Sequence, residues 1–307
     1  MQNSKIEWTD HTFNPWWGCQ RVSPGCEYCY AETMAHRYNF RVWGPAKTTG
    51  RREMSANYWR QPLRWNDAAR RAGTRARVFC ASMADVFEDH PAVVAWRQRL
   101  WTVVQDTPWL DWLLLTKRPE NIKYMLPLAW QDAPRDNVWI GTSVEDQQRA
   151  NERIPHLLRV PAKVRFLSCE PLLGPLDLDH FLIDDRTRIG DDVHYHDHPA
   201  LHWVICGGES GPGARPMHPA WARSLRDQCE AARVAFFFKQ WGEYAPAPWG
   251  KPDPKPALAV RTNGQSVYAQ VGHVAGFRAP DEVCMERLGK HASGRLLDNR
   301  EYNELPA

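Results

Sequence analysis

Short apolar runs alternate with amphipathic segments through most of this chain. Six runs are rich in Val, Ile, Leu, Phe and Trp, and each ends in polar residues. They cover residues 77–82, 112–117, 138–143, 164–169, 203–208 and 235–239. Runs this short and this continuously apolar are typical of strands that are buried on both faces of a parallel sheet.

The segments between these runs have the pattern of helices. Residues 91–105 and 219–232 each begin with proline, which is favoured in the first turn of a helix. Residues 120–125 and 145–158 continue the alternation, and residues 30–38 supply an earlier helix. Strands that alternate with helices form parallel sheets with right-handed crossovers. The pattern therefore predicts an α/β fold, a full or partial (β/α) TIM-like barrel with about six to seven parallel strands.

A flat, doubly wound sheet is the alternative architecture. It has less support, because no G-x-G-x-x-G motif follows an early strand. The regular alternation ends near residue 245, and the proline-rich stretch 246–256 has the composition of a stiff linker. We therefore expect a barrel over residues 1–245, whose N-terminal segment adds a strand, and a C-terminal extension over 246–307 that packs on the barrel.

Polar residues stand at the end of every predicted strand. For any one of them, a helix cap or a salt bridge is an equally good explanation. Together they predict a polar cavity, because barrel enzymes carry their chemistry at the carboxyl ends of the strands. These residues are Asp85, Lys117, Arg118, Ser143, Glu145, Ser168, Glu170, Glu209, Ser210, Lys239 and Gln240.

Charge and composition exclude some classes of protein. The 39 Lys and Arg residues nearly balance the 36 Asp and Glu residues, so no overall field favours nucleic acid. The segment 51–77 is locally basic, however, and Tyr58, Trp59 and Trp65 stand between its arginines. It could follow a phosphate backbone while its rings stack on bases, or it could be a solvated surface where Arg covers Trp. Nucleic acid or a nucleotide is therefore a candidate substrate.

The chain has no apolar run of 18 residues and no signal-peptide character at its start, so we expect a cytoplasmic protein without a membrane partner. A reducing compartment would keep its eight cysteines as thiols. The acidic segment 179–199 contains four histidines, which solvated surface explains better than a metal site. Its role and the oligomeric state stay open.

Three cysteines form a C-x6-C-x2-C cluster near the start of the chain: Cys19, Cys26 and Cys29. Three closely spaced thiolates can hold three irons of a [4Fe-4S] cluster and leave the fourth iron open for a substrate or cofactor. A closed zinc site needs four protein ligands, and no fourth ligand of the usual spacing is nearby. We therefore predict an open iron–sulfur cluster, with zinc or free thiols as the alternatives.

An aromatic residue, Tyr28, directly precedes the last of these cysteines. At this point the sequence resembles the radical S-adenosylmethionine (SAM) proteins, whose cluster loop is usually C-x3-C-x-aromatic-C near the N-terminus of a (β/α) barrel. It resembles more closely the three-Cys-motif proteins of bacteriophages and bacterial genomes. The stretches that carry this resemblance are 8–9, 14–15, 18–31, 207–211, 239–242 and 294–298.

The resemblance implies a cofactor and a reaction. SAM would complete the fourth iron through its amino and carboxylate groups, and an electron from an external donor would cleave it to methionine and a 5′-deoxyadenosyl radical. Glu209 would bind the SAM ammonium, because the glycines Gly207 and Gly208 let a ligand approach the backbone. Ser143 and Ser168 are further cofactor-binding candidates.

The resemblance also leaves places for catalytic residues at the strand ends. The candidates are Glu170, Lys117 and Lys239, and either lysine could bind a carboxylate or a phosphate. Two other readings stay open at this point: an iron–sulfur protein of DNA repair or electron transfer that does not use SAM, and a zinc-stapled binding module without catalysis. The cysteines in predicted strands, Cys80, Cys169 and Cys206, are expected to be small buried hydrophobes.

Overall fold

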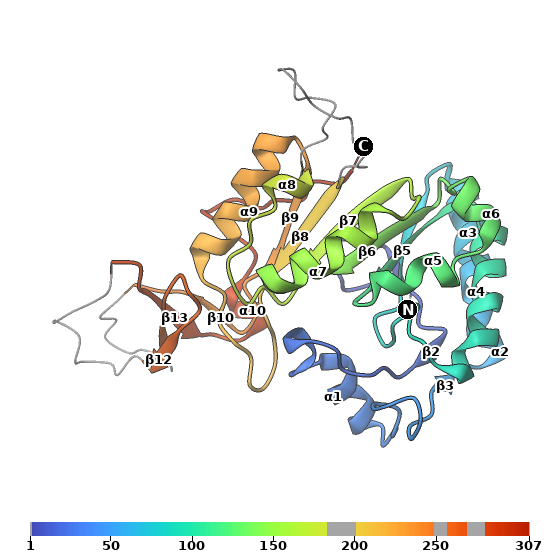
Figure 1. Ribbon diagram of the computed structural model, residues 1–307, viewed down its shortest axis with the longest axis horizontal. Helices are drawn as coiled ribbons and strands as arrows, with labels where there is room; N and C mark the ends of the chain where they lie inside the picture. The colour runs from blue at the N-terminus through green and yellow to red at the C-terminus, as the bar shows by residue number, and fades with distance from the viewer. Residues whose placement is uncertain (1, 183–200, 249–256, 269–279, 307) are drawn as a thin grey trace. The chain divides into compact units, whose positions relative to one another are not determined.

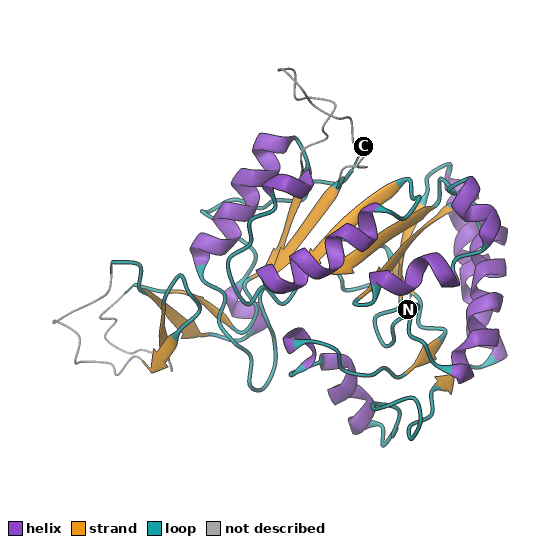
Figure 2. Ribbon diagram, viewed as in Figure 1, coloured by secondary structure: helices purple, strands orange, loops and turns teal. Residues whose placement is uncertain are grey.

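A seven-stranded sheet forms the centre of the computed structural model, which describes residues 2–182, 201–248, 257–268 and 280–306 (Figures 1 and 2). Its strand order is β1-β4-β5-β6-β7-β8-β9, and this parallel sheet curls into a half-barrel. The predicted α/β fold is therefore confirmed, as a partial barrel. The strands are β1 (His11–Thr12), β4 (Ala76–Cys80), β5 (Leu110–Thr116), β6 (Val138–Ser143), β7 (Val164–Cys169), β8 (Trp203–Gly207) and β9 (Ala235–Gln240).

All six apolar runs of the sequence are strands of this sheet, β4 to β9. The seventh strand, β1, is only two residues long and pairs with β4 ahead of the cysteines. The predicted helices are also present. The helices are α1 (Tyr30–Arg37), α2 (Ala56–Trp59), α3 (Gln61–Ala72), α4 (Val94–Asp106), α5 (Ile122–Met125), α6 (Leu128–Asp132), α7 (Gln147–Leu158), α8 (Asp179–Leu182), α9 (Pro219–Ala232) and α10 (Lys290–Ser293).

The chain divides into two compact units. Unit 1 comprises Met1–Ser143 and Arg153–Phe166, and unit 2 comprises Val144–Glu152 and Leu167–Ala307. The boundary expected after residue 245 stays a prediction.

The core of unit 1 lies between the strands and the helices α3 and α4, which pack against each other. Strands β4 and β5 are paired in parallel, and Trp112 of β5 is fully buried while its indole N–H donates to Thr107 Oγ1 at 3.0 Å. Helix α3 carries Pro in its first turn and ends at Gly73, which adopts a left-handed conformation. Burying one large apolar side chain of this core contributes about 1.5–3 kcal/mol.

A small antiparallel ribbon in unit 1 frames the cysteines. It consists of β2 (Trp16–Trp17) and β3 (Arg52–Glu53), and Trp16 is fully buried. The cysteine loop leaves β2, includes a short 3-10 helix over Pro24–Cys26, and ends at the start of α1. The ribbon therefore anchors the N-terminal end of this loop in the core.

In unit 2 the C-terminal tail pairs with the edge strand β9. Phe237 bridges to Asn303, and the Phe238 N–H donates to the Tyr302 carbonyl at 3.0 Å. Asp298 accepts hydrogen bonds from Arg223 and Arg226 of α9, which fix the start of the tail. An open sheet edge invites pairing with other chains, so the tail protects the edge of the half-barrel.

A second, antiparallel sheet with the order β10-β13-β11-β12 completes unit 2. Its strands are β10 (Tyr244–Pro246), β11 (Ala257–Val260), β12 (Ser266–Tyr268) and β13 (Val283–Arg287). Most of the expected linker lies outside the described residues, as do His194, His196 and His198 of the acidic segment. Among the helices of the described ranges, none is long and apolar enough to cross a membrane.

Candidate functional site

The three cysteines lie on one loop of unit 1, between β2 and α1. All three are free thiols, and each is half-buried. Cys29 occupies the N-cap position of α1. The positive end of a helix dipole stabilises a thiolate at such a position. The loop therefore presents three potential sulfur ligands, each in a different setting.

Cys19 is held by a cation and by a neighbouring loop. The Arg118 guanidinium donates from Nη1 to the Cys19 sulfur at 3.6 Å and from Nη2 to the Gln20 carbonyl at 2.7 Å. The Cys19 carbonyl accepts the Gly44 N–H at 3.0 Å. Arg118 follows β5, so the end of that strand positions the first cysteine.

Arg118 is itself fixed by Asp85, the polar residue expected after β4. The two side chains form an ion pair of 2.8 Å, and both are largely buried. Asp85 also accepts the Thr116 hydroxyl at 2.7 Å and the Lys117 N–H at 3.1 Å. These bonds tie the ends of β4 and β5 together beneath the cysteine loop.

A second buried ion pair extends this network. Arg51 and Glu88 form two hydrogen bonds of 2.8 and 2.7 Å, and the Arg51 side chain is fully buried. Arg51 also donates to the carbonyls of Val42, Gly44, Thr49 and Gly50, and Glu88 lies 3.7 Å from Arg118. The interpretation of Arg51 as part of a basic nucleic-acid surface is wrong, because this side chain is buried and paired. Trp59 and Trp65 of the same segment are buried as well.

The network shapes the acidity of the cysteines. Burial raises the pKa of Cys19 to about 12; the carboxylates of Asp85 and Glu88 add to this rise, and Arg118 opposes it. Burial also raises the pKa of Cys29, while nearby backbone N–H groups and the charge of Lys117 act in the opposite direction. Without a metal, both side chains are therefore neutral thiols at pH 7. A metal must displace these protons to bind.

The donor set fits an iron–sulfur cluster by its chemistry, but its geometry is not preformed. Three free thiolates are the ligands that such clusters require. Among the described residues, no group of three Cys, His, Asp or Glu side chains is arranged so that it could hold a metal ion. Binding of a cluster would therefore have to draw the three sulfurs together, with Cys19 held by Arg118.

Two other predicted site residues meet in unit 1. The Lys117 ammonium donates to Ser143 Oγ at 3.1 Å, so the ends of β5 and β6 are joined by a polar contact. Ser143 is almost fully buried, and its carbonyl accepts Arg153 Nη1 at 2.8 Å. Lys117 also lies close enough to Cys29 to affect its pKa. It is the predicted catalytic residue that lies in the same unit as the cysteines.

In unit 2 the predicted catalytic residues Glu170 and Lys239 form an ion pair of 3.0 Å, and both are mostly buried. Gly207 makes room for this pair, since a Cβ there would lie 2.5 Å from Glu170 Oε1. Ser168 is buried, and its carbonyl accepts the Val144 N–H at 3.0 Å. The polar residues at the ends of β7 and β9 are therefore in contact within unit 2, and the polar cavity expected above the strands stays a prediction.

Gly208 and Gly242 are required by a close crossing of two backbone segments. A Cβ on Gly208 would lie 1.9 Å from the Trp241 carbonyl oxygen, and a Cβ on Gly242 would lie 2.2 Å from the Glu209 carbonyl oxygen. Gly242 also has a φ of +88°. Packing of the chain against itself thus explains why position 208 needs a glycine. The sequence had suggested that this glycine lets a ligand approach the backbone.

Glu209 already has a cationic partner. Its carboxylate accepts two hydrogen bonds from the Arg215 guanidinium, at 2.6 and 2.8 Å, and one from the Arg215 N–H at 2.9 Å. Nearby, Gln240 Nε2 donates to Ser210 Oγ at 3.3 Å, whereas Gln240 Oε1 is buried and has no hydrogen-bond partner among the described residues. An unsatisfied acceptor of this kind costs free energy unless a donor reaches it.

Sequence reasoning missed the partners that fix these residues. Glu88 and Arg215 were not identified as parts of a site, and Arg51 was assigned to a basic surface, because an ion pair between distant positions leaves no local pattern. The short spacing from Glu209 to Arg215 was the signal that could have suggested their pairing. The five cysteines outside the loop are buried and form no disulfide, as expected for the strand residues: Cys80, Cys169, Cys206, Cys229 and Cys284.

Comparison with solved structures finds similarity to spore photoproduct lyase. One point mutant of that protein gives a TM-score of 0.40 at 12% identity, over 88% of this chain and 71% of that chain. A second point mutant gives a TM-score of 0.42 at 14% identity, over 82% and 68%. A double mutant with bound AdoMet and dinucleoside spore photoproduct gives a TM-score of 0.39 at 13% identity, over 80% and 67%.

A comparison with curated proteins gives no match. The model of one protein family, described as "Protein of unknown function (DUF5131)", matches residues 3–306. Because this match extends over nearly the whole sequence, the chain belongs to the DUF5131 family.

Proposed function

We propose that this chain is an iron–sulfur enzyme that binds a [4Fe-4S] cluster through Cys19, Cys26 and Cys29 and uses it with SAM. The cysteine loop of unit 1 carries the proposal: three free thiols, one of them hydrogen-bonded to the buried cation Arg118. A closed zinc site would need a fourth ligand, whereas a cubane held by three cysteines leaves one iron open. The half-barrel and its polar strand ends supply a scaffold of the kind that the resemblance implies.

The chain's own residues would hold and shield the group. Arg118 would keep Cys19 and the Gln20 carbonyl in place, and its positive charge would offset part of the negative charge of the ligating sulfurs. The charge of Lys117 would offset negative charge in the same way near Cys29. When bound, such a cluster supplies an electron for the reductive cleavage of SAM. The electron would come from an external donor, and a nucleic acid or nucleotide is the candidate substrate.

In unit 2, Glu209 remains our proposed contact for the ammonium group of SAM, and Gly207, Gly208 and Ser168 remain further proposed cofactor contacts. Its carboxylate is engaged by Arg215, so an ammonium would have to share or displace that guanidinium. The buried Gln240 Oε1 offers a second acceptor for such a donor. Ser143 stays a proposed cofactor contact in unit 1.

Glu170, Lys117 and Lys239 stay proposed catalytic residues. The Glu170–Lys239 pair keeps a carboxylate and an ammonium together in a mostly buried position. A pair of this kind can hold a proton at one atom or bind an anionic group of a substrate through the lysine. Lys117, which donates to Ser143, has the same capacity near the cysteine loop.

A second candidate function is an iron–sulfur protein of DNA repair or electron transfer that does not use SAM. The Glu209–Arg215 pair favours this candidate, because the carboxylate proposed for SAM already has a bidentate partner. Under this function the cluster ligands are the same three cysteines.

The direct test is incubation of the anaerobically reconstituted protein with dithionite and SAM. We expect 5′-deoxyadenosine from the wild-type chain and from Cys284→Ala, and none from Cys26→Ala. A reduced cluster that yields no 5′-deoxyadenosine would contradict SAM chemistry and favour the second candidate. About one zinc per chain without iron or sulfide would contradict both and leave a zinc-stapled module.

A further inference from the structure

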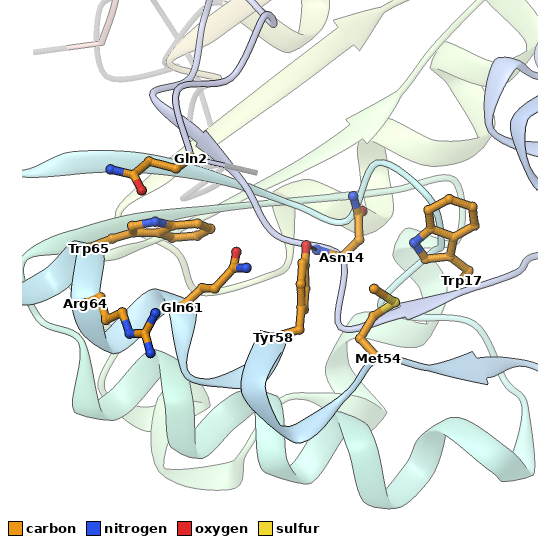
Figure 3. A pocket seen from close by; sticks show the side chains of 8 residues that line it. All are labelled: Gln2, Asn14, Trp17, Met54, Tyr58, Gln61, Arg64 and Trp65. Atoms are coloured by element: carbon orange, nitrogen blue, oxygen red, sulfur yellow. Dashed lines mark hydrogen bonds between the residues drawn. The ribbon is translucent and has the colours of Figure 1, made fainter.

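A cavity of about 360 Å3 opens in unit 1 beside the ribbon that carries the cysteine loop. Its size lies at the small end of the roughly 300–1,000 Å3 that ligand pockets span. None of the proposed cluster or cofactor residues lines it. The lining residues are Gln2, Asn14, Trp17, Met54, Tyr58, Gln61, Arg64 and Trp65 (Figure 3).

The aromatic walls of this cavity are fixed by a second layer of rings. Tyr58 stacks on Phe13 with the rings 9° from parallel, and Trp65 stacks on His11 at 20°. Rings that are held in this way can stack on a planar ligand without first losing rotational freedom. The ring pairs and their centroid distances are Trp65 with His11 (4.5 Å), Tyr58 with Phe13 (5.2 Å), and Trp17 with Tyr38 (5.8 Å) and Phe40 (5.6 Å).

Three polar side chains of the cavity are uncommitted, whereas the Asn14 amide is hydrogen-bonded to Ser82 and to the Met83 N–H. Among the residues that the structure describes, the side chains of Gln2, Gln61 and Arg64 have no hydrogen-bond or ion-pair partner. Figure 3 shows the Gln61 amide between Trp65 and Tyr58, with the Arg64 guanidinium beside it. The Tyr58 hydroxyl accepts the Asn14 N–H at 3.0 Å, so its own proton can be donated to a ligand.

These groups match the parts of a nucleotide. Stacked rings bind the faces of a base, and amides recognise its edge because an amide donates and accepts hydrogen bonds at once. Arg64 is the one charged side chain of the lining, and a guanidinium is suited to a phosphate. No carboxylate lines the cavity to repel that phosphate.

We propose that this cavity binds one nucleotide unit, with the base between the aromatic walls and Gln61 and the phosphate on Arg64. The nucleotide could be free or part of a single strand. The inference goes beyond the proposed function, because it requires neither the cluster nor SAM. It also assigns the nucleic-acid contact of the basic segment 51–77 to Arg64 and not to Arg51.

The test is calorimetric titration of the full-length, metal-free protein with adenosine 5′-monophosphate (AMP), adenosine and ribose 5-phosphate. We expect AMP to bind more tightly than either part. Arg64→Gln should weaken AMP by about tenfold, as the loss of one charge-assisted contact implies, and should leave adenosine unchanged. Gln61→Ala should weaken AMP and adenosine alike. The matched controls, Arg71→Gln and Gln98→Ala, remove exposed side chains outside the cavity and should bind as wild type does.

Three results would overturn the proposal. They are no binding of AMP at millimolar concentration, equal affinities for AMP and ribose 5-phosphate, and an unchanged affinity in both Arg64→Gln and Gln61→Ala. A short single-stranded oligonucleotide in the same titration separates the two sources of the nucleotide. Tighter binding than AMP, weakened by Arg64→Gln, would identify a strand. Because the titration uses metal-free protein, failure of the iron–sulfur proposal would leave its outcome unaffected.

Discussion

The two units treat their candidate residues in opposite ways. In unit 1 the charged residues Arg51, Glu88, Asp85 and Arg118 satisfy one another in a buried network, and the three loop cysteines form no disulfide, although Cys19 accepts a hydrogen bond from Arg118. In unit 2 the motif residue Glu209 forms an ion pair with Arg215. The cysteine motif of unit 1 therefore offers ligands for a metal, whereas the Gly207–Glu209 motif of unit 2 takes part in packing and in an ion pair. The difference is that Glu209 is already bound in an ion pair with Arg215, whereas Cys19 and Cys29 are neutral thiols.

The largest effect should come from breaking the network of unit 1. Arg51→Met would leave Glu88 with only its longer contact to Arg118 and would remove the guanidinium donor from four carbonyls, so we expect a loss of about 3–5 kcal/mol of unfolding free energy. Urea unfolding followed by circular dichroism measures it. The exposed Arg71→Met should change stability by less than about 0.5 kcal/mol. Equal losses of unfolding free energy in Arg51→Met and Arg71→Met would contradict a stabilising role of the buried network.

The next effect should come from the backbone crossing of unit 2. Gly208→Ala would place a methyl group 1.9 Å from the Trp241 carbonyl oxygen, and we expect it to cost about 1–3 kcal/mol or more. Gly50→Ala is the matched control, because a Cβ there meets nothing within 4 Å. The readout is the midpoint of chemical unfolding. A stable Gly208→Ala protein that has lost only SAM binding would mean that the glycine serves the ligand instead.

A smaller effect is expected from the Glu209–Arg215 pair. Glu209→Gln and Arg215→Gln should each lower stability by about 1–2 kcal/mol, because hydrogen bonds to charged groups are lost. The double variant should lose less than the sum of the two, with a coupling of about 1 kcal/mol. Glu230→Gln, on the exposed side of α9, serves as the control. If the stability loss of the double variant equals the sum of the two single losses, Glu209 and Arg215 do not interact, and Glu209 is available to bind a ligand.

The smallest effect concerns pH. Burial lowers the pKa of His218, whose Nδ1 accepts the Ala220 N–H at the start of α9. Below its ordinary value of 6.5 the unfolded chain binds the proton more readily than the folded chain, so stability should fall as the pH drops from 7.5 to 5.5. His218→Asn keeps an N-cap acceptor and should reduce this slope of the melting temperature. The exposed His36→Asn should not, and a slope unchanged by His218→Asn would contradict the assignment.

Much of the fold could be predicted because the relevant signals are local. Strands β4 to β9 are continuous apolar runs, and α9 begins and ends where the sequence pattern placed it. Helix α3 was missed, because its arginines and aromatic residues were interpreted as a surface for nucleic acid, although its buried residues Pro62, Trp65 and Ala69 recur with a helical period. The antiparallel sheet β10–β13 was missed too, since its strands have three to five residues and carry little pattern.

In the candidate site, too, the local signals could be predicted and the contacts between distant segments could not. The spacing of Cys19, Cys26 and Cys29 is readable in the sequence, and so is the accumulation of polar residues at the strand ends. The pairing of Arg51 with Glu88 and the crossing of Gly208 with Gly242 are not readable, because they join segments that only the folded chain brings together. The sequence thus identifies candidate ligands, and the structure determines which of them have partners.

Iron and sulfide analysis with electron paramagnetic resonance, after anaerobic reconstitution, determines whether the three cysteines hold an iron–sulfur cluster. We expect about four iron and four sulfide per chain and a cubane signal upon reduction, in wild type and in Cys284→Ala. We expect loss of the cluster in Cys19→Ala, Cys26→Ala and Cys29→Ala. A wild-type chain with about one zinc, or a Cys19→Ala chain that retains four irons, would contradict the assignment of the three cysteines as cluster ligands.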